Sequence, residues 1–461
     1  MANIKSFNIV LPFGPTPNTK FLLSDVDQIK LWNHVSLLYI YKPQNSISSD
    51  NSLVPVIEIM RNSLSQALDF YYPLAGRLHW SEGDRLELDC KPKGVQLLVA
   101  DSEATLDDLG DFAPTKALKD LVPNVNYGSA IEEMPLLVVQ ITRFRCGGLG
   151  LGVALCRAML DGNATFGFIN SWAKLARGEK LDLVPFHDRN VLKPSGKLLK
   201  PCFDHIEFKQ LPTSKAEFNK ESSIVMLKVT KEQVEKLKQM ANQFYKEDQN
   251  IGQQRPFSRF EVLAGHIWRC ACKARYKGNS HQPTKVSIII DCRSRLKPPL
   301  PVGYFGNATL PTVTPLCLFA DLIFKPLSYA AGKIRRAIDD MTDEYIRSAI
   351  SFIASQRDMN LLRTSYQTPD SNEGSHVLGN PNLNIVSWMN MPIEGADFGF
   401  GKPSFLGPGS IISEGKAFIV SSCDDDGSLN VPFRLNAAHM DAFKKFFYED
   451  IHEVPFHFSK V

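Results

Sequence analysis

Short apolar runs rich in β-branched and aromatic residues alternate with segments of helical period in the first part of the chain. The runs HVSLLYIY at 34–41, PLLVVQITRF at 135–144 and LGLGVAL at 149–155 have the composition of buried strands. Between the first two, VPVIEIMRNSLSQALDFY at 54–71 repeats its apolar residues at helical spacing. This pattern predicts a mixed α/β fold.

A second set of similar segments follows residue 222. SSIVMLKV at 222–229 and TKVSIIIDC at 284–292 are typical of strands. KEQVEKLKQMANQFYK at 231–246 and SRFEVLAGHIWRCACKAR at 258–275 are typical of helices. Because the two parts of the chain have similar content, we expect two domains of similar construction.

The length of the chain, 461 residues, also exceeds what a single hydrophobic core usually reaches. The stretch 184–222 is dense in proline and lysine and has little periodic pattern, as expected of a connection between domains. We therefore predict an N-terminal domain over 1–183, an interdomain crossover over 184–222 and a C-terminal domain over 223–461. Ligand sites favour the seam between domains, so we expect the functional site there.

Charge and cysteine content narrow the classes of function. The formal net charge is only +3, without a strong run of either sign, which argues against nucleic acid or a membrane surface as partner. The nine cysteines form no C-x-x-C pair, which predicts reduced thiols rather than a disulfide framework, and no metal site.

The chain ends carry little targeting information. The N-terminus lacks the architecture of a signal peptide, and no apolar stretch reaches the roughly 18 residues that would span a bilayer. We therefore expect a cytoplasmic protein. The last three residues, Ser459, Lys460 and Val461, come close to a Ser-Lys-Leu peroxisomal address but differ at the final position, and we interpret them as an ordinary tail.

Five distinctive segments occur in a fixed order: YYPLAGRL at 71–78, CRAMLDG at 156–162, FEVLAGHIWRCACKAR at 260–275, DCRSRLKPPLPVGYFGNA at 291–308 and DFGFGKP at 397–403. Together they resemble the plant BAHD acyltransferases over essentially the whole chain. The resemblance is strongest to the spermidine hydroxycinnamoyl transferase group, through LARGEK, GYFGNATL, NPNLNIVSW and AHMDAFKKFFYED. It extends to the piperamide (piperine-type) synthases.

The resemblance implies two α/β domains similar to chloramphenicol acetyltransferase, with mixed sheets and a solvent channel between them. Acyl-CoA would enter from one face as co-substrate and a small-molecule acceptor from the other, with no bound cofactor, in a protein expected to be a monomer. In the family a His-x-x-x-Asp motif lies at the channel centre, where the histidine deprotonates the acceptor. On this sequence the aspartate matches Asp161, whereas the histidine position holds Arg157.

Arg157 cannot act as the general base, because a guanidinium stays protonated and offers only donors. Three hypotheses follow. In the first, the enzyme transfers an aromatic acyl group to an aliphatic amine, which is nucleophilic as its free base, and Arg157 stabilises the tetrahedral oxyanion or holds an anionic group. The acceptor would be a polyamine or a cyclic secondary amine such as piperidine.

In the second hypothesis the scaffold is a lyase and Arg157 clamps a carboxylate substrate; a second cation beside Arg157 would favour it. In the third the protein is a catalytically inactive binder. A base recruited from elsewhere in the chain remains a further alternative. His34 and His266 are expected to be hydrogen-bonded core residues, and Cys156 a buried structural thiol.

The resemblance also assigns roles to other residues. Asp161 is expected to form a structural ion pair with Arg293, with Gly162 allowing a tight backbone before a helix. Trp388 would line the acceptor channel and help to hold the oxyanion through its indole N–H, with a purely structural aromatic as the alternative.

Two further groups of residues lie outside this centre. Asp397, Gly399 and Gly401 belong to a structural loop in which Phe400 replaces the usual tryptophan. On the CoA side the resemblance indicates the residues Ser258, Arg259 and Asn307, each of them a weak signal.

Overall fold

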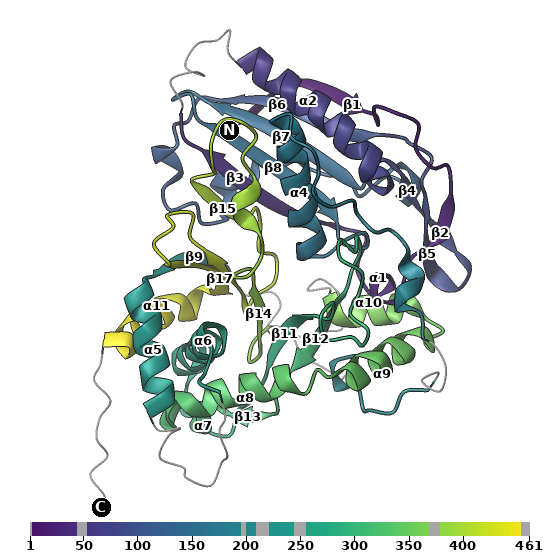
Figure 1. Ribbon diagram of the computed structural model, residues 1–461. Coiled ribbons are helices and arrows are strands. Elements are labelled where there is room, and N and C mark those ends of the chain that lie inside the picture. Colours follow the sequence, from purple (N-terminus) through teal and green to yellow (C-terminus); the bar gives the residue numbers. More distant parts are fainter. Residues whose placement is uncertain are drawn as a thin grey trace, which may run out of the picture.

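The computed structural model describes residues 2–43, 53–194, 200–208, 221–243, 255–367 and 379–452. The chain forms two lobes, each built around a six-stranded mixed sheet with helices packed on it (Figure 1). The predicted α/β class with mixed sheets is confirmed.

The sheet of the first lobe has the strand order β1-β6-β7-β8-β3-β15 and is antiparallel except between β6 and β7. Its strands are β1 (Ala2–Val10), β3 (His34–Tyr41), β6 (Val95–Ser102), β7 (Leu137–Phe144), β8 (Leu149–Cys156) and β15 (Phe405–Pro408). Two amphipathic helices, α2 (Leu53–Phe70) and α4 (Gly162–Ala176), pack together on one face (Figure 1).

Smaller elements complete this lobe. They are the helix α3 (Lys116–Lys119) and a three-stranded sheet of β2 (Lys20–Leu22), β4 (Arg77–Ser81) and β5 (Arg85–Asp89). The short helix α1 (Asp25–Gln28) lies where the lobes meet, with Val26 in the core of the second lobe. Short 3-10 turns occur in both lobes, at Tyr72–Ala75, Glu82–Asp84, Asp107–Leu109, Ile131–Glu133, Arg189–Leu192, Ile206–Phe208 and Ile393–Gly395.

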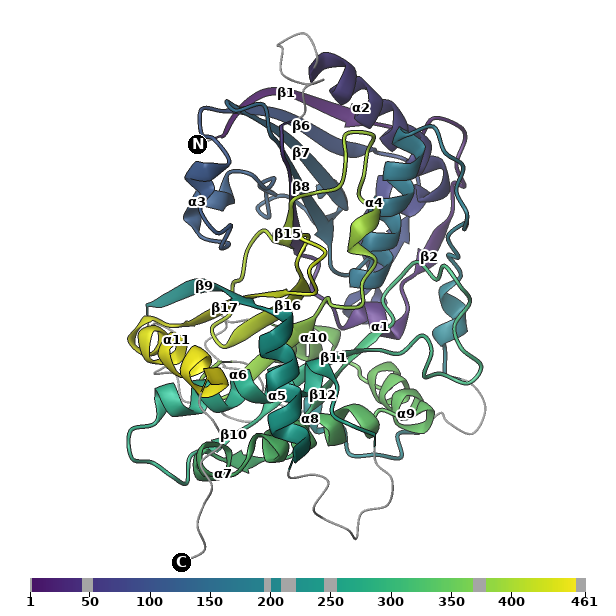
Figure 2. The same ribbon diagram turned by 60° about the vertical axis from the view of Figure 1, so that its left-hand side comes forward.

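The sheet of the second lobe has the order β12-β11-β14-β16-β17-β9. Its strands are β9 (Ser222–Val229), β11 (Val286–Asp291), β12 (Thr309–Val313), β14 (Leu383–Ser387), β16 (Lys416–Ser421) and β17 (Leu429–Asn436). The helices of this lobe are α5 (Lys231–Gln243), α6 (Arg259–Arg275), α7 (Phe319–Phe324), α8 (Leu327–Asp339), α9 (Asp343–Ala354), α10 (Met359–Gln367) and α11 (Ala437–His452), and a small sheet pairs β10 (Pro283–Thr284) with β13 (Cys317–Leu318). Figure 2 shows α5, α6, α8 and α11 on the side of this sheet that faces away from the first lobe.

The boundary predicted at residue 223 misses one connection. β15 comes from the C-terminal part of the chain but pairs with β3 in the first sheet, with Phe405 opposite Ile40 and Leu406 opposite Tyr39. Its four residues, FLGP, are too few to show a strand period in the sequence. The C-terminal part of the chain therefore supplies the last strand of the N-terminal sheet.

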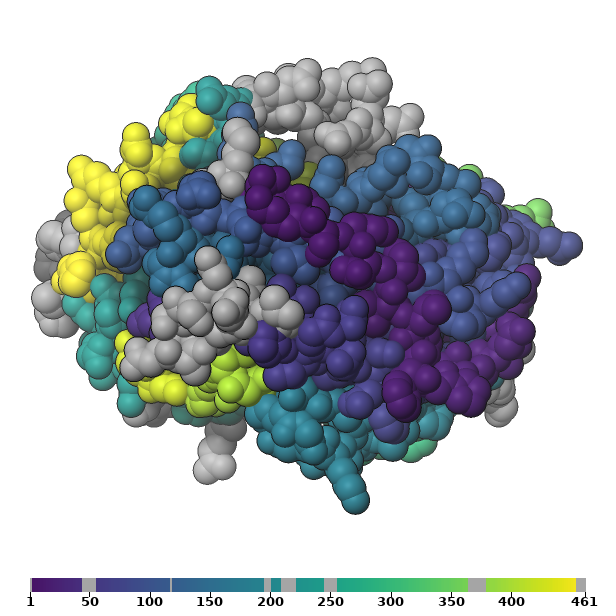
Figure 3. Space-filling model, turned by 90° about the horizontal axis from the view of Figure 1, so that it is seen from above, coloured from purple at the N-terminus to yellow at the C-terminus, as the bar shows by residue number. Residues whose placement is uncertain are grey.

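β1 forms the opposite edge of the first sheet and leaves apolar side chains exposed, among them Ile4, Phe7 and Ile9. Figure 3 shows the N-terminal residues, in the darkest purple, as a band on the surface of this lobe.

Within the described ranges, no helix is long and apolar enough to cross a membrane. All nine cysteines are free thiols, as predicted.

Two glycines provide a matched test of the packing. A Cβ added at Gly152 on β8 would lie 2.2 Å from Leu121 O, whereas one at Gly167 inside α4 would meet no atom within 4 Å. Gly152→Ala should lower the free energy of unfolding by about 1–3 kcal/mol through overpacking. Gly167→Ala should raise it by about 0.5–1 kcal/mol, because alanine is the better helix former. Urea unfolding measures both, and a stable Gly152→Ala variant would contradict the packing described here.

Candidate active site between the two lobes

Asp161 binds the two lobes together. It is the N-cap of α4, where its Oδ1 accepts a hydrogen bond from Ala164 N at 3.1 Å. From the second lobe, Ala308 N donates to Oδ2 at 2.8 Å. Arg293 adds two hydrogen bonds, from Nη1 to Oδ2 at 2.8 Å and from Nη2 to Oδ1 at 3.0 Å. The expected Asp161–Arg293 ion pair is thus present, and it leaves the carboxylate fully occupied and unsuited to acid or base chemistry.

Gly162 is constrained by packing rather than by a left-handed backbone. A Cβ at this position would lie 2.7 Å from Met391 Cε and 2.9 Å from its sulfur. The expected tight approach is therefore made by a side chain of the loop after β14. Any larger residue at the start of α4 would displace the end of the Met391 side chain.

A second polar network lies beside Asp161. Asp27 in α1 accepts hydrogen bonds from Asn307 N at 2.9 Å and Asn307 Nδ2 at 2.8 Å, and from Arg189 Nη1 at 2.5 Å. The Asn307 amide also donates to the backbone oxygen of Arg157 at 3.1 Å. Asn307 is only 2% exposed, so its N–H groups hold the turn that carries Arg157 and are not free for CoA.

Arg157 lies in the turn between β8 and α4, where its backbone N–H donates to Asn33 O at 2.9 Å. The turn is thus held from both lobes, through Asn33 and Asn307. The arginine side chain is partly buried. Its charge reaches two lysines that come from different elements.

The first of these lysines is Lys30, which follows α1. Its Nζ donates to Thr309 O at 3.0 Å. Burial, followed by the charge of Arg157, lowers the pKa of Lys30 to about 8, although Asp161 and Asp27 act in the opposite direction.

The second is Lys416, the first residue of β16. Side chains on a strand alternate between its faces. Ala417 and Ile419 belong to the core of the second lobe, whereas Phe418 and Val420 belong to the core of the first. Lys416 shares the face of Phe418 and Val420 and therefore points into the seam. Burial, followed by the charge of Arg157, lowers the pKa of Lys416 to about 7.

Trp388 follows β14 and completes the wall of the seam. Its ring packs on Phe418 at 4.9 Å between centroids and on Phe166 of α4 at 5.6 Å. None of the described residues accepts a hydrogen bond from its indole N–H, and this nitrogen is not among the buried unpaired atoms. Trp388 thus packs as an aromatic of the seam and still has a donor to offer, which fits both expected roles.

Residues 397–401 form a tight loop in which Asp397 Oδ1 accepts hydrogen bonds from Gly399 N at 2.8 Å and Gly401 N at 2.9 Å. Both glycines have positive φ, +99° and +91°, a conformation that other residues rarely adopt. Phe400 packs edge-on against Tyr41 of β3 with ring centroids 4.8 Å apart. The loop therefore has the expected structural character and anchors the segment leading to β15.

The side chains of His34, His266 and Cys156 form hydrogen bonds with backbone oxygens of the protein. Nε2 of His34 contacts Pro135 O and that of His266 contacts Phe447 O, both at 2.8 Å, and burial lowers both histidine pKa values to about 4. Cys156 is buried and donates to Trp32 O, and burial raises its thiol pKa to about 12. Cys156 is thus a structural thiol, as predicted.

Similarity to known proteins now bears on this geometry. A model of the family described as the Transferase family matches residues 1–450. Hydroxycinnamoyl-CoA:piscidic acid hydroxycinnamoyltransferase of Actaea racemosa is 45% identical, over 98% of this chain and 100% of its own length. The chain belongs to the BAHD acyltransferases. It is accordingly an enzyme that transfers acyl groups, with acyl-CoA as co-substrate and no cofactor.

Other members of the family agree with this assignment. Shikimate O-hydroxycinnamoyltransferase of Nicotiana tabacum is 40% identical, over 97% of this chain and 99% of its own length. Hydroxycinnamoyl-CoA:5-hydroxyanthranilate N-hydroxycinnamoyltransferase of Avena sativa is 36% identical, over 96% and 98%. Among solved structures, vinorine synthase shares the two-domain chloramphenicol-acetyltransferase-like fold, with a TM-score of 0.72, 21% identity and 96% of each chain covered.

The three residues expected to contact CoA lie in two places, at the start of α6 and in the seam between the lobes. Ser258 is the N-cap of α6 and forms a capping box with Glu261, so its hydroxyl already has a structural role. Arg259 is exposed at the start of the same helix, whereas Asn307 is buried in the seam. A CoA contact therefore stays a prediction for Ser258 and Arg259.

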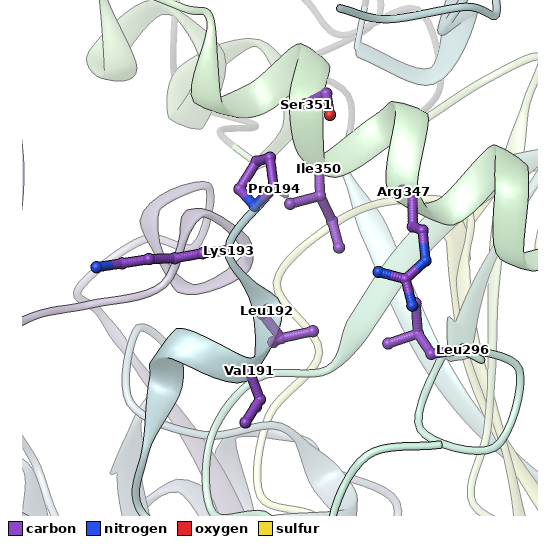
Figure 4. A pocket seen from close by; sticks show the side chains of 8 residues that line it. All are labelled: Val191, Leu192, Lys193, Pro194, Leu296, Arg347, Ile350 and Ser351. Atoms are coloured by element: carbon purple, nitrogen blue, oxygen red, sulfur yellow. The ribbon is translucent and has the colours of Figure 1, made fainter. Parts of the chain in front are cut away.

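Two other features lie away from the seam. Val191, Leu192, Lys193, Pro194, Leu296, Arg347, Ile350 and Ser351 line a hollow of about 290 Å³ that includes open solvent. Figure 4 shows these side chains, with Lys193 pointing away from the others.

His266, Cys270 and Asp450 have ligand-type atoms within 4.8 Å of one another. Asp450 is paired with Lys273, and the His266 ring is hydrogen-bonded to Phe447 O, which gives both residues structural roles.

Neither Lys30 nor Lys416 lies in a motif that marks it as a site residue in the sequence. The only signal for Lys416 is a lysine at the head of the apolar strand KAFIVS. Helical and strand periods identify which residues share a face, but they do not reveal that this face of β16 meets Arg157.

Removing Asp161 should mainly damage folding. Because breaking a buried ion pair leaves its partner uncompensated, Asp161→Ala should lower the free energy of unfolding by about 3–5 kcal/mol. Asp182→Ala is the control, since Asp182 pairs with Lys174 at the surface with its side chain 78% exposed, and it should change stability by less than about 1 kcal/mol. Equal losses in chemical denaturation would contradict the structural role of Asp161.

Proposed function

We propose that this enzyme transfers a hydroxycinnamoyl-type aromatic acyl group from CoA to an amine, forming an amide. The observation that carries the proposal is Arg157 at the position where the family resemblance implies the catalytic histidine. An alcohol needs a base to become nucleophilic, whereas an amine attacks with its own lone pair and loses its proton afterwards. The relative from Avena sativa, named as an N-hydroxycinnamoyltransferase, supports amide formation within this scaffold.

The charges of the seam narrow the choice of amine. Arg157, Lys30 and Lys416 lie on the same seam, and the pKa of each lysine responds to the arginine. A polyamine carries several positive charges, and each would be repelled by Arg157 and by Lys30, whose pKa of about 8 leaves it mainly protonated at neutral pH. The same cations favour the free base of a bound amine. We therefore favour an acceptor with one nitrogen, such as a cyclic secondary amine, over spermidine.

A lyase acting on a carboxylate substrate is the second candidate. The observation in its favour is a further cation close to Arg157, because Lys30, with a pKa of about 8, is mainly protonated at neutral pH. An anion in the seam would be stabilised by such a group of cations. Acyl transfer is favoured over it because the relatives are named as acyltransferases.

The first experiment measures CoA-thiol release from a hydroxycinnamoyl-CoA ester by the purified protein. Piperidine, spermidine, 5-hydroxyanthranilate, an aliphatic alcohol and no acceptor are compared in parallel. We expect release that depends on an amine and not on the alcohol. The absence of acceptor-dependent release from several acyl-CoA esters would overturn amide formation. In that event, binding and CoA-independent turnover of carboxylate substrates would establish the lyase.

Arg157→His tests what the arginine changes. A histidine at this position offers a lone pair at neutral pH, and general-base assistance contributes roughly 10²–10⁴-fold. The variant should therefore gain activity toward the alcohol by about this factor, measured as kcat/KM under the same conditions. Unchanged discrimination between alcohol and amine would argue against the proposed role of position 157.

A further inference from the structure

We infer that Lys416 is the proton acceptor for the attacking amine, in place of the histidine that the family resemblance implies. This inference rests on the proposed amide formation. It assigns the base to a residue of β16 in the second lobe, on the wall of the seam opposite the turn that carries Arg157.

Lys416 lies beside an aromatic side chain in the seam between the lobes. Its side chain lies on the face of β16 that meets the first lobe, with Nζ 5.1 Å from the centroid of the Phe418 ring. The same ring packs on Trp388, whose indole N–H is available to an oxyanion. Lys416 and Trp388 thus flank one aromatic side chain, which brings a proton acceptor and an oxyanion donor to one part of the seam.

The surroundings of Lys416 disfavour its positive charge. Of the described residues, none forms a hydrogen bond or ion pair with its Nζ, so no carboxylate compensates a charge there. On its two neighbouring strands the residues in register are Asn384 of β14, which is neutral, and Arg434 of β17. Arg434 donates to Ser222 Oγ and to Ile411 O, and the charge of Arg157 acts on Lys416 from the first lobe.

A neutral lysine offers the lone pair that Arg157 lacks. Burial and the Arg157 charge leave the pKa of Lys416 at about 7, so its free amine is the main form just above neutral pH. Arg157 then has a second effect besides attracting negative charge, because it keeps the nearby lysine in the form that accepts protons.

The proposed sequence conserves atoms and charge. The lone pair of the amine attacks the thioester carbon, the new C–N bond forms, and the carbonyl electron pair moves to oxygen. Lys416 Nζ takes the proton that the nitrogen must lose. The oxyanion then collapses, the C–S bond breaks, and the leaving thiolate takes the proton from the Lys416 ammonium.

Substitution of Lys416 tests this role. Lys416→Met and Lys416→Arg should each lower kcat/KM with the amine by about 10²-fold or more, because neither side chain accepts a proton. Lys445→Met, at an exposed lysine of α11, is the matched control and should retain full activity. Retention of activity in Lys416→Arg would overturn the proposal, since it would mean that the residue only holds an anion by its charge.

The dependence of kcat/KM on pH separates a base from a residue with only a structural role, because only a base changes the pH at which activity rises. For the wild type, kcat/KM should rise with pH through about 7, because the base is the unprotonated form. Arg157→Gln removes a charge that lowers the pKa of Lys416, so this rise should move to higher pH. An unmoved rise would overturn the assignment. Wild-type protein that is inactive with every amine would instead refute the proposed amide formation. This outcome differs from that of an active enzyme whose pH profile does not depend on Arg157, which would refute only the assignment of Lys416 as the base.

Discussion

The two hydrogen bonds between Arg293 and Asp161 join the lobes at the point where the reaction is expected. Asp161 begins α4 in the first lobe, and Arg293 follows β11 in the second, so the pair fixes both elements relative to each other. Removing such a pair from solvent is costly, and it is stabilising only when every remaining polar atom finds a partner. The backbone N–H groups of Ala164 and Ala308 meet this condition. The turn from 157 to 160 lies between β8 and this anchor, and its geometry depends on the anchor.

Arg157 is unusual because its neighbours at the seam include lysines rather than carboxylates alone. Asp161 is paired with Arg293, and Asp27 is bonded to Arg189 and Asn307, so both carboxylates have structural roles. Burial and the charge of Arg157 lower the pKa values of Lys30 and Lys416, so that positive charge on these two lysines is disfavoured. An acidic substrate group would reverse this balance, because it would stabilise the protonated form of both lysines.

Local sequence patterns predicted much of the fold. The strands at 34–41 and 222–229 begin and end as expected, and the helix expected over 258–275 is present as α6, with Ser258 as its N-cap. These elements are determined by side chains only a few residues apart. Lys416 and β15 escaped prediction because their roles depend on contacts with residues hundreds of positions away in the chain. The family resemblance located the Asp161–Arg293 pair, but a motif cannot reveal which side chains surround an altered residue.

The position of β15 has a consequence for synthesis of the protein. Until residues 405–408 are available, β3 is the edge of the first sheet, and its apolar sequence HVSLLYIY has no partner on that side. An unpaired apolar edge is prone to join other chains. Since the ribosome releases residue 408 only near the end of translation, the N-terminal sheet remains incomplete during most of synthesis. The order of residues along the chain thus exposes an apolar strand edge early and supplies the strand that covers it late.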